Sequence, residues 1–296
     1  MTDIRIGISG WTYGNWHGDF YPEDLPKRKE LEYAGRIFNS IEVNGSFYTL
    51  IKPDTWRRYY EQTPPGFLFA VKGSRFITHT KKLKDIKTPL ANFFASGFLE
   101  LREKLGPILW QFSARGPEKG RYEAFLELLP KNTKEAAELA KHHDHRLSGR
   151  ASTRVDRNRR IRHAFEIRDE KLFVPEFVRL IRRHGVALVF SDSGKWPYIE
   201  EITGGFVYLR LHGSPHTYAS RYSDKDLDRW ADSIRRWTSG SEPDHPERIT
   251  DRKPPQRKTR DAYVYFDNDY HGHAPHDACR LMARLGVKTN SGKGHP

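Results

Sequence analysis

Eight short apolar segments recur along the chain, and this repetition constrains the fold more than any other feature. They are rich in β-branched and aromatic residues, have the length of strands and end in polar residues or glycine. Amphipathic segments lie between them, with helix starts indicated at Pro53, Pro175 and Ser223. The predicted strands span residues 5–11, 40–48, 67–73, 107–112, 162–168, 187–192, 206–213 and 262–269.

Alternation of strands and helices predicts parallel strands joined by right-handed crossovers, and eight such units close most simply into a single (β/α)8 barrel of the TIM type. A doubly wound open sheet is the alternative. It is disfavoured because no strand–turn–helix carries a GxGxxG or Walker glycine loop, which also means that no nucleotide-cofactor motif is present. We expect one barrel domain over residues 1–288 and a frayed tail over 289–296.

The chain is basic, with 51 Lys and Arg against 38 Asp and Glu and a net charge of +13. Residues 146–162 and 248–260 supply 11 of the 13 net charges, and they fall largely within two polar loops, 143–160 and 239–261, which run from a helix into the next strand. Such connections lie on the bottom face of a barrel, away from the active-site face. This placement favours two solvated basic loops, and it leaves nucleic-acid binding open as a weaker interpretation.

Two features missing from the sequence, paired cysteines and a signal or membrane segment, bear on the cellular location of the protein. The single cysteine, Cys279, excludes an intramolecular disulfide and a thiolate-rich zinc site. The N-terminus enters a strand-like segment without a signal segment, and no apolar stretch approaches the roughly 20 residues that a membrane helix needs. We therefore expect a cytoplasmic protein that does not associate with membranes.

Polar side chains recur at the ends of the predicted strands, at positions that alternate with apolar ones. Because residues two apart share a face of a strand, the outward Ile41 and Val43 place Glu42 and Asn44 toward the barrel axis. Barrel enzymes carry their active sites at these carboxyl ends. The expected ring comprises Glu42, Asn44, Lys72, Gln111, Glu166, Arg168, Asp192, Arg210, His212 and Asp267.

The chemistry of the ring suggests roles for its members. Lys72 and Arg210 are suited to hold a phosphate or carboxylate, while crowded carboxylates push one another's pKa values apart and so serve as acid and base. The candidate catalytic residues are Glu42, Glu166, Asp192 and His212. The candidate substrate- or anion-binding residues are Asn44, Tyr48, Lys72, His79, Arg168, Arg210, Asp267, Asn268 and Trp11.

Two other interpretations of the ring stay open. A divalent metal would suit the ligands Glu42, Glu166, Asp192, His212 and Asp267, although no HExxH or closely spaced histidine pair supports it. Alternatively, the ring is a self-satisfied ion network, with pairs such as Glu42–Lys72 and Glu166–Arg168. The aromatic loop 11–22 would then cover the core rather than stack on a ligand.

The motifs SGWTYGNWHGDFYPEDLP, IEVNGSFYTL, TPPGFLFAVKGSRFITHTKKL, EIRDE, FVYLRLHG and VYFDND resemble the YecE-like family, domain of unknown function 72, in order over roughly residues 4–286. The resemblance implies a TIM-type barrel and no established reaction. Segments 113–120 and 270–276 depart from the family pattern. The family's recurrent positions fall on Glu42, Asn44, Phe47, Tyr48, Lys72, His79, Glu166, Arg168, Asp192, Arg210, His212, Gly213, Asp267 and Asn268.

Three functions compete at this stage. The leading hypothesis is an enzyme of the hydrolase or isomerase class that acts on a small polar, phosphorylated or sugar-like substrate by acid–base chemistry, with or without a metal. The second is a metal-dependent nuclease or nucleic-acid repair protein, by analogy with other barrels. The third is a non-catalytic binding module whose polar ring is structural.

Overall fold

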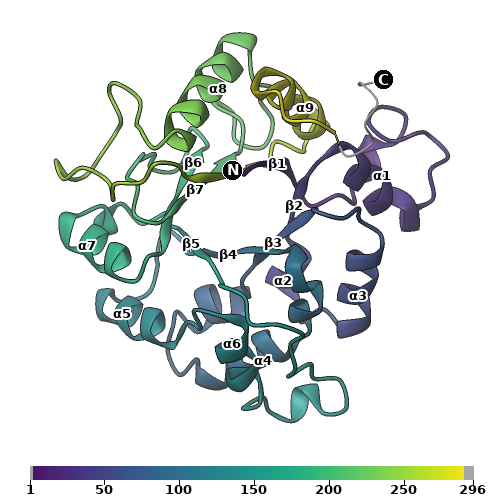
Figure 1. Ribbon diagram of the computed structural model, residues 1–296, viewed down its shortest axis with the longest axis vertical. Coiled ribbons are helices and arrows are strands. Elements are labelled where there is room, and N and C mark those ends of the chain that lie inside the picture. Colours follow the sequence, from purple (N-terminus) through teal and green to yellow (C-terminus); the bar gives the residue numbers. More distant parts are fainter. Residues whose placement is uncertain (1–2, 290–296) are drawn as a thin grey trace. The chain divides into compact units, whose positions relative to one another are not determined.

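The computed structural model describes residues 3–289, so the expected frayed tail lies outside the described residues except for its first residue. Eight parallel strands form a closed barrel in chain order from β1 to β8, which confirms the predicted (β/α)8 fold (Figure 1). The strands are β1 (Ile4–Ser9), β2 (Ser40–Val43), β3 (Leu68–Lys72), β4 (Leu105–Gln111), β5 (His163–Glu166), β6 (Ala187–Asp192), β7 (Phe206–Leu211) and β8 (Asp261–Phe266).

The predicted helix starts are confirmed. Pro53 and Pro175 are the first residues of their helices, and the Ser223 hydroxyl accepts a hydrogen bond from the Asp226 amide in a capping box. The helices are α1 (Glu30–Ile37), α2 (Gly45–Tyr48), α3 (Pro53–Glu61), α4 (Lys87–Ala95), α5 (Lys119–Leu128), α6 (Thr133–Ala140), α7 (Pro175–Arg183), α8 (Asp224–Thr238) and α9 (His273–Leu285).

The second predicted strand, residues 40–48, extends beyond the observed strand. It ends at Val43, and the short helix α2 follows. The Ser46 hydroxyl donates to the carbonyl oxygens of Val43 at 3.0 Å and Lys72 at 2.7 Å, so a side chain holds the backbone in a turn where the strand would otherwise continue. As a result the Tyr48 ring is 69% exposed.

The chain forms two compact units. Unit 1 is built from the segments before Val43 and after Leu172, and unit 2 is the segment Val43–Leu172 between them. Unit 1 therefore holds β1, nearly all of β2, β6 to β8, α1 and α7 to α9, whereas unit 2 holds β3 to β5 and α2 to α6. Each unit carries its own group of polar side chains at the carboxyl ends of its strands.

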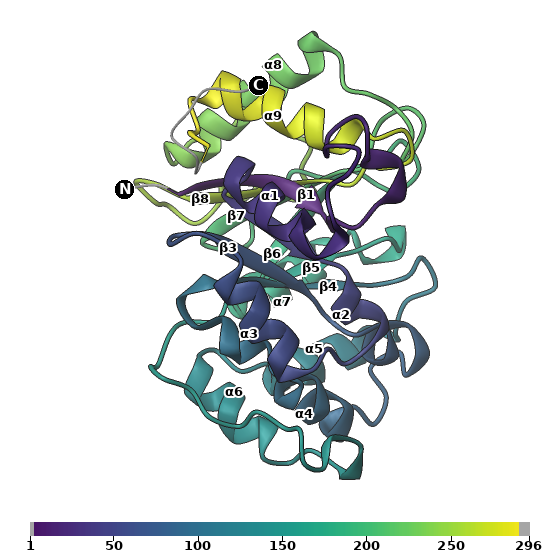
Figure 2. The ribbon, with the colours of Figure 1, turned by 90° about the vertical axis from the view of Figure 1, so that its right-hand side faces the viewer.

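In unit 1, α8 and α9 lie side by side over β8 (Figure 2). Ion pairs join the two helices, with Arg284 contacting Asp228 at 2.6 Å and Arg280 contacting Asp224 at 2.8 Å. The register of the strands is set by ladder hydrogen bonds that place Ser9 opposite Glu42. This register brings the polar ends of β1 and β2 together.

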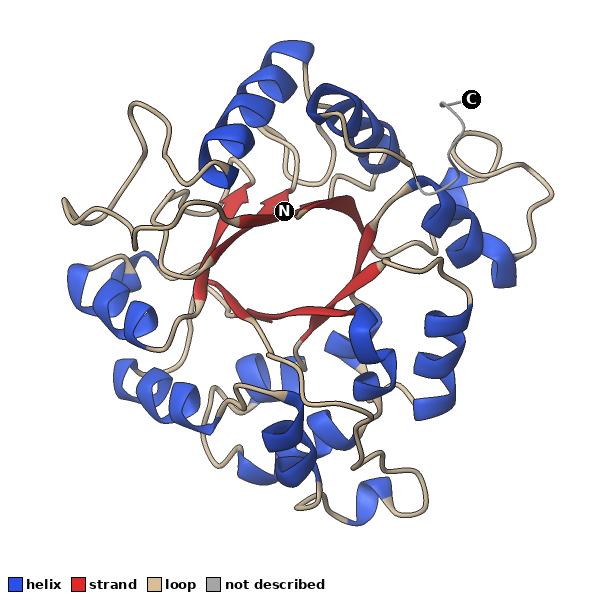
Figure 3. Ribbon diagram, viewed as in Figure 1, coloured by secondary structure: helices blue, strands red, loops and turns tan. Residues whose placement is uncertain are grey.

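In unit 2, helices α4 to α6 lie on one side of its strands (Figure 3). Buried aromatic rings pack between these helices and the strands. Trp110 on β4 packs against Phe93 and Phe125, and its indole N–H donates to His163 Nδ1 at 3.1 Å. Because Nδ1 accepts, Nε2 carries the ring proton and donates to the Pro130 carbonyl oxygen at 2.9 Å. Burial lowers the pKa of His163 to about 4, so the ring stays neutral.

The two basic loops each lead from a helix into a strand, the first from α6 into β5 and the second from α8 into β8. Within the first loop Arg159 pairs with Asp156 at 2.6 Å, and at the start of the second Arg236 pairs with Asp244 at 2.8 Å. None of the helices within residues 3–289 combines the length and apolarity needed to span a bilayer.

Candidate functional site

At the carboxyl ends of the unit 1 strands, a cluster centres on the buried carboxylate of Glu42. We call it the Glu42 cluster; its members are Ser9, Glu42, Tyr208, Arg210, His212 and Asp267. Glu42, at 0% exposure, accepts hydrogen bonds from the Ser9 hydroxyl at 2.8 Å, the Tyr208 hydroxyl at 2.6 Å and the Arg210 Nη2 at 2.8 Å. Both of its oxygens are thus occupied by neighbours within the same unit.

Arg210 connects the two carboxylates of this cluster. Its Nη2 also donates to Asp267 Oδ2 at 2.8 Å, and His212 Nδ1 lies 2.9 Å from that same oxygen. The guanidinium is fully buried and is therefore held between two negative groups rather than in water. Since Asp267 contacts both Arg210 and His212, it orients these two side chains at the end of β7.

Asp269, which the sequence analysis did not single out, lies beside this cluster. Burial and, next, the negative charge of Asp267 hold the pKa of its carboxyl well above its ordinary value. The Tyr13 hydroxyl also interacts with this carboxyl. The single proton of the Tyr13 hydroxyl is donated to the Ser9 carbonyl oxygen at 2.6 Å. The Tyr13 oxygen can therefore accept a hydrogen bond from a protonated Asp269.

A signal for Asp269 was present in the sequence. Asp267 and Asp269 are two residues apart in the segment FDND, and residues at this spacing share a face of a strand. The predicted strand 262–269 included both residues, whereas β8 ends at Phe266.

Three other predicted residues of unit 1 serve the loops around the cluster. Asp192 accepts a hydrogen bond from the Tyr222 hydroxyl at 2.9 Å, and burial raises the pKa of its carboxyl. The Asn268 amide donates to the Ser220 carbonyl oxygen at 3.0 Å and to Asp277 at 2.9 Å. The carbonyl oxygen of Trp11 accepts from the Tyr21 hydroxyl at 2.7 Å.

Two aromatic rings lie next to His212 at the rim of unit 1. The centroid of Trp196 is 5.2 Å from the imidazole and that of Tyr218 is 5.5 Å from it, both edge-on. These rings are 6.0 Å from each other, and Tyr218 is 39% exposed. They offer apolar faces beside a polar cluster, the composition that ligand sites share.

Unit 2 holds a second group at the carboxyl ends of its strands. We call it the Lys72 cluster; its members are Phe47, Tyr48, Lys72, Arg75, His79, Glu166 and Arg168. The expected Glu166–Arg168 ion pair is present at 2.8 Å, and Gln111 donates to the other carboxylate oxygen at 2.9 Å. Glu166 is fully buried, so these two partners fix its position.

Cations and aromatic rings alternate in the rest of the Lys72 cluster. Lys72 Nζ lies 4.5 Å from the Phe47 ring centroid, while the Arg75 guanidinium carbon lies 6.0 Å from Phe47 and 5.9 Å from Tyr48. His79 meets Phe47 edge-on at 5.2 Å. Burial, then the positive charges of Lys72, Arg168 and Arg75, lower the pKa of His79 to about 4.

Local backbone geometry presents these side chains. Residues Phe76–Thr80 form a π-helical turn after β3. Such turns are rare in proteins, and those that occur are often found at functional sites. Within it the Thr78 hydroxyl is 2.8 Å from His79 Nδ1 and so fixes the ring. Asn44, which precedes α2, has a buried side-chain Oδ1 that makes no hydrogen bond.

A metal site was left open by the sequence. Within the described part of the chain, no group of three or more His, Cys, Asp or Glu side chains is placed to hold a metal ion. The predicted ligands Glu42, His212 and Asp267 contact Arg210 or one another in the Glu42 cluster, and Glu166 contacts Arg168.

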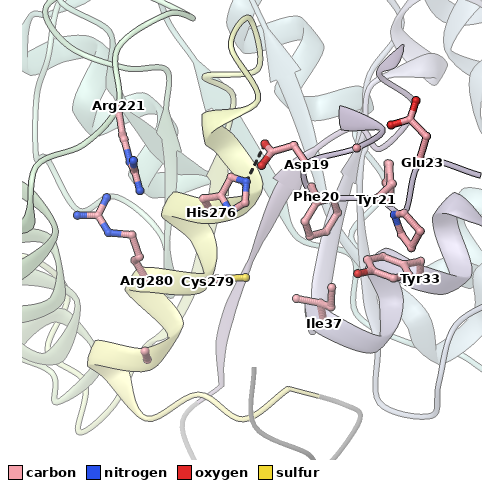
Figure 4. A pocket seen from close by; sticks show the side chains of 13 residues that line it. Asp19, Phe20, Tyr21, Glu23, Tyr33, Ile37, Arg221, His276, Cys279 and Arg280 are labelled. Atoms are coloured by element: carbon pink, nitrogen blue, oxygen red, sulfur yellow. Dashed lines mark hydrogen bonds and ion pairs between the residues drawn. The ribbon is translucent and has the colours of Figure 1, made fainter. Parts of the chain in front are cut away.

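A large cavity lies elsewhere in unit 1; it involves none of the predicted ring residues but is lined by the end of the aromatic loop 11–22. It has a volume of about 910 Å³ and is bounded by loop 18–23, α1 and α9 (Figure 4). His276 Nε2 contacts Asp19 Oδ2 at 2.9 Å across its edge, while Phe20, Tyr33 and Cys279 give it an apolar wall. Burial raises the pKa of the Cys279 thiol to about 12, which makes it a poor nucleophile at neutral pH.

Comparison with known proteins agrees with this architecture. The chain is similar over 96% of its length to a DUF72 family protein of Thermotoga maritima, with a TM-score of 0.71, 23% identity and 99% of that chain covered. A DUF72 family protein of Enterococcus faecalis gives a TM-score of 0.68, 15% identity and 96% coverage of both chains. At these identities the likeness shows the fold alone.

Sequence comparison identifies relatives of the same kind. UPF0759 protein YecE of Escherichia coli is 32% identical over 133 residues, which are 40% of this chain and 46% of YecE, so the match spans about half of that relative. UPF0759 protein YunF of Bacillus subtilis is 31% identical over 75 residues, 25% of this chain and 26% of YunF. The model of the family described as "Protein of unknown function DUF72" matches residues 5–296, and the chain therefore belongs to the DUF72 family.

Proposed function

We propose that the protein is a cytoplasmic enzyme that acts on a small hydroxylated, sugar-like substrate by general acid–base catalysis at the carboxyl ends of the unit 1 strands. One observation carries the proposal. Asp267 and Asp269 lie close together but in different surroundings, since Asp267 contacts Arg210 and His212 whereas Asp269 lies against the Tyr13 hydroxyl. Two carboxyls in unlike surroundings can divide the roles of acid and base between them.

In this proposal Asp269 is the general acid. Its raised pKa favours the protonated carboxyl, which can donate a proton to a substrate oxygen. Asp267 stays in contact with Arg210 and orients His212, which faces the aromatic rings of Trp196 and Tyr218. Those rings would pack on the apolar face of a sugar.

Glu42 takes a different role from the one suggested by its sequence position. It is fully buried and receives hydrogen bonds from three side chains. A carboxylate saturated in this way has no oxygen to offer a substrate. We therefore assign Glu42 to the positioning of Arg210, and through Arg210 of Asp267.

The test is turnover of a defined panel of pentoses, hexoses and their monophosphates, followed by proton NMR in buffered D₂O. Asp269→Asn should lower the rate for any compound that wild-type protein converts by about 10²- to 10⁴-fold, the usual contribution of a general acid. Asp19→Asn is the matched control, because Asp19 is an exposed carboxylate of the same unit that pairs with His276. Wild-type rates in Asp269→Asn, or no conversion of any sugar by wild-type protein, would contradict the proposal.

A further inference from the structure

The cavity of unit 1 has an apolar wall. It is lined by loop 18–23, by α1 and by one face of α9, whose lining residues recur at intervals of three and four: His276, Cys279, Arg280 and Ala283. Phe20 of the loop is 8% exposed and meets the Tyr33 ring of α1 edge-on at 5.6 Å. Together with Ile37, these rings offer a surface that favours contact with an apolar group over contact with water.

Two arginines lie at one end of the same cavity. Arg280 of α9 and Arg221, which precedes α8, both approach Oδ1 of the buried Asp277. Arg280 Nη1 donates to that oxygen at 2.8 Å, whereas Arg221 Nε lies 3.8 Å from it, beyond hydrogen-bond distance. Because both guanidinium groups converge on one carboxylate oxygen, they lie next to each other at this end (Figure 4).

The two arginines differ in how firmly they are held. Arg280 also donates to the Tyr222 carbonyl oxygen at 2.8 Å and to Asp224 Oδ1 at 2.8 Å. The guanidinium of Arg221 donates no hydrogen bond to any residue that the structure describes, and 58% of the side chain is exposed. Arg221 can therefore turn toward an anion in the cavity without breaking a hydrogen bond of the fold.

The two carboxylates that line the cavity do not occupy Arg221. Asp19 Oδ2 contacts His276 Nε2 at 2.9 Å. Glu23 lies on the side of the cavity away from Arg221 (Figure 4). The cavity therefore offers an apolar wall next to a guanidinium group that is available for an anion.

From this arrangement we propose that the cavity binds a small monocarboxylic acid with an apolar body, with the carboxylate on Arg221 and the body against Phe20, Tyr33 and Ile37. The planar fork of an arginine matches the geometry of a carboxylate. The volume of about 910 Å³ lies within the usual range of small-molecule sites. The inference goes beyond the proposed function, since it involves no residue of the Glu42 cluster and does not involve Asp269.

The experiment uses 4-phenylbutyrate as the probe on the full chain. Its amide, 4-phenylbutyramide, has the same body without the charge, and acetate has the charge without the body. Titration calorimetry at constant ionic strength should show saturable binding of the acid. The amide should bind on the order of tenfold more weakly, because a charge-assisted interaction is lost, and acetate should not bind measurably.

Cys279 reports where the acid binds. It is the single cysteine of the chain and lines the cavity, so alkylation by iodoacetamide at alkaline pH, followed by mass spectrometry, monitors this site alone. Bound acid should slow the alkylation of Cys279 with the same concentration dependence as the calorimetric signal. Acetate should leave the rate unchanged.

Variants separate the charge from the apolar body. Arg221→Gln should weaken binding of the acid on the order of tenfold and leave the amide unchanged, so that the two ligands bind alike. Ala283→Trp places a large ring in the cavity from an exposed position of α9 and should abolish binding of both. Lys225→Gln is the matched control, because Lys225 is an exposed cation of α8 that does not line the cavity.

The outcomes discriminate. Equal binding of acid and amide by wild-type protein, equal loss in Arg221→Gln and Lys225→Gln, or binding that does not protect Cys279 would each overturn the proposal. Protection of Cys279 that grows with protein concentration in the absence of the acid would overturn it in favour of a second copy of this chain. Asp269→Asn should bind the acid like wild-type protein, so failure of the acid–base proposal and failure of this one are distinguishable.

Discussion

The Glu42 cluster and the Lys72 cluster are built from the same sequence pattern, polar side chains at the ends of barrel strands, but they differ in how their charges are compensated. In unit 1 the buried Arg210 lies between the carboxylates of Glu42 and Asp267. In unit 2 Glu166 is paired with Arg168, and Lys72 and Arg75 add positive charge. The first arrangement fixes side chains between opposite charges, whereas the second places cations against the Phe47 ring.

The largest expected effect comes from removing a carboxylate that offsets the buried charge of Arg210 in unit 1. Glu42→Leu removes the acceptor for Ser9, Tyr208 and Arg210, and leaves Arg210 buried with less negative charge around it. We expect a loss of about 3–5 kcal/mol in the free energy of unfolding, measured in urea. Tyr208→Phe, which removes one hydrogen bond to the same carboxylate, should cost only about 1 kcal/mol. Equal losses in the two variants would show that Glu42 does not anchor the cluster.

The next effect concerns Asp269. A carboxyl whose pKa is raised in the folded state binds more protons there than in the unfolded state, so the free energy of unfolding falls as the pH rises above the ordinary Asp value. Asp269→Asn removes this penalty, on the order of 1.4 kcal/mol for each pKa unit of the shift. We therefore expect a variant that is more stable than wild-type protein at pH 7 and has lost activity. Reduced stability at pH 7 would mean that Asp269 is a structural anion.

A smaller effect of the opposite sign is expected in unit 2. The pKa of His79 is lowered to about 4, so the unfolded state binds the extra proton and the free energy of unfolding rises as the pH increases from about 4 to the ordinary His value. His79→Gln should reduce this rise in the free energy of unfolding by about 1 kcal/mol. The figure is reduced for solvent screening because the side chain is only partly buried. Thermal unfolding at pH 4.5 and pH 7 measures it. An unchanged slope would show that His79 does not contribute to it.

The smallest effect is expected away from both clusters. Asp19 and His276 form an exposed ion pair at the edge of the cavity in Figure 4. Asp19→Asn should change the free energy of unfolding by no more than about 0.5 kcal/mol, since exposed pairs contribute little. Chemical denaturation of the variant tests this, and a loss above about 1 kcal/mol would show that the pair organises loop 18–23.

The sequence predicted the barrel well because strands and helices have different hydrophobic periods, and each of the eight predicted strands overlaps an observed one. It was less accurate where a side chain redirects the backbone. Ser46, for example, ends β2 early by donating to two carbonyl oxygens. A strand pattern has no means of showing such a local hydrogen bond.

The polar residues were predictable as a set, but their individual roles were not. Glu42 and Glu166 occupy like positions in the pattern, yet one receives Arg210, Tyr208 and Ser9 and the other Arg168 and Gln111. Asp267 and Asp269 both lie beyond Phe266, the last residue of β8, although the predicted strand 262–269 included them. Pairing across strands depends on register and side-chain reach, which a single sequence does not contain.

The most direct test of the account is a ¹³C NMR titration of the side-chain carboxyl of Asp269, assigned by comparison with Asp269→Asn. The proposed role of Asp269 predicts that this carbon titrates well above the ordinary Asp value of about 4. Titration of Asp269 near pH 4 would contradict it, because an ionised Asp269 could not act as the general acid of the proposed reaction.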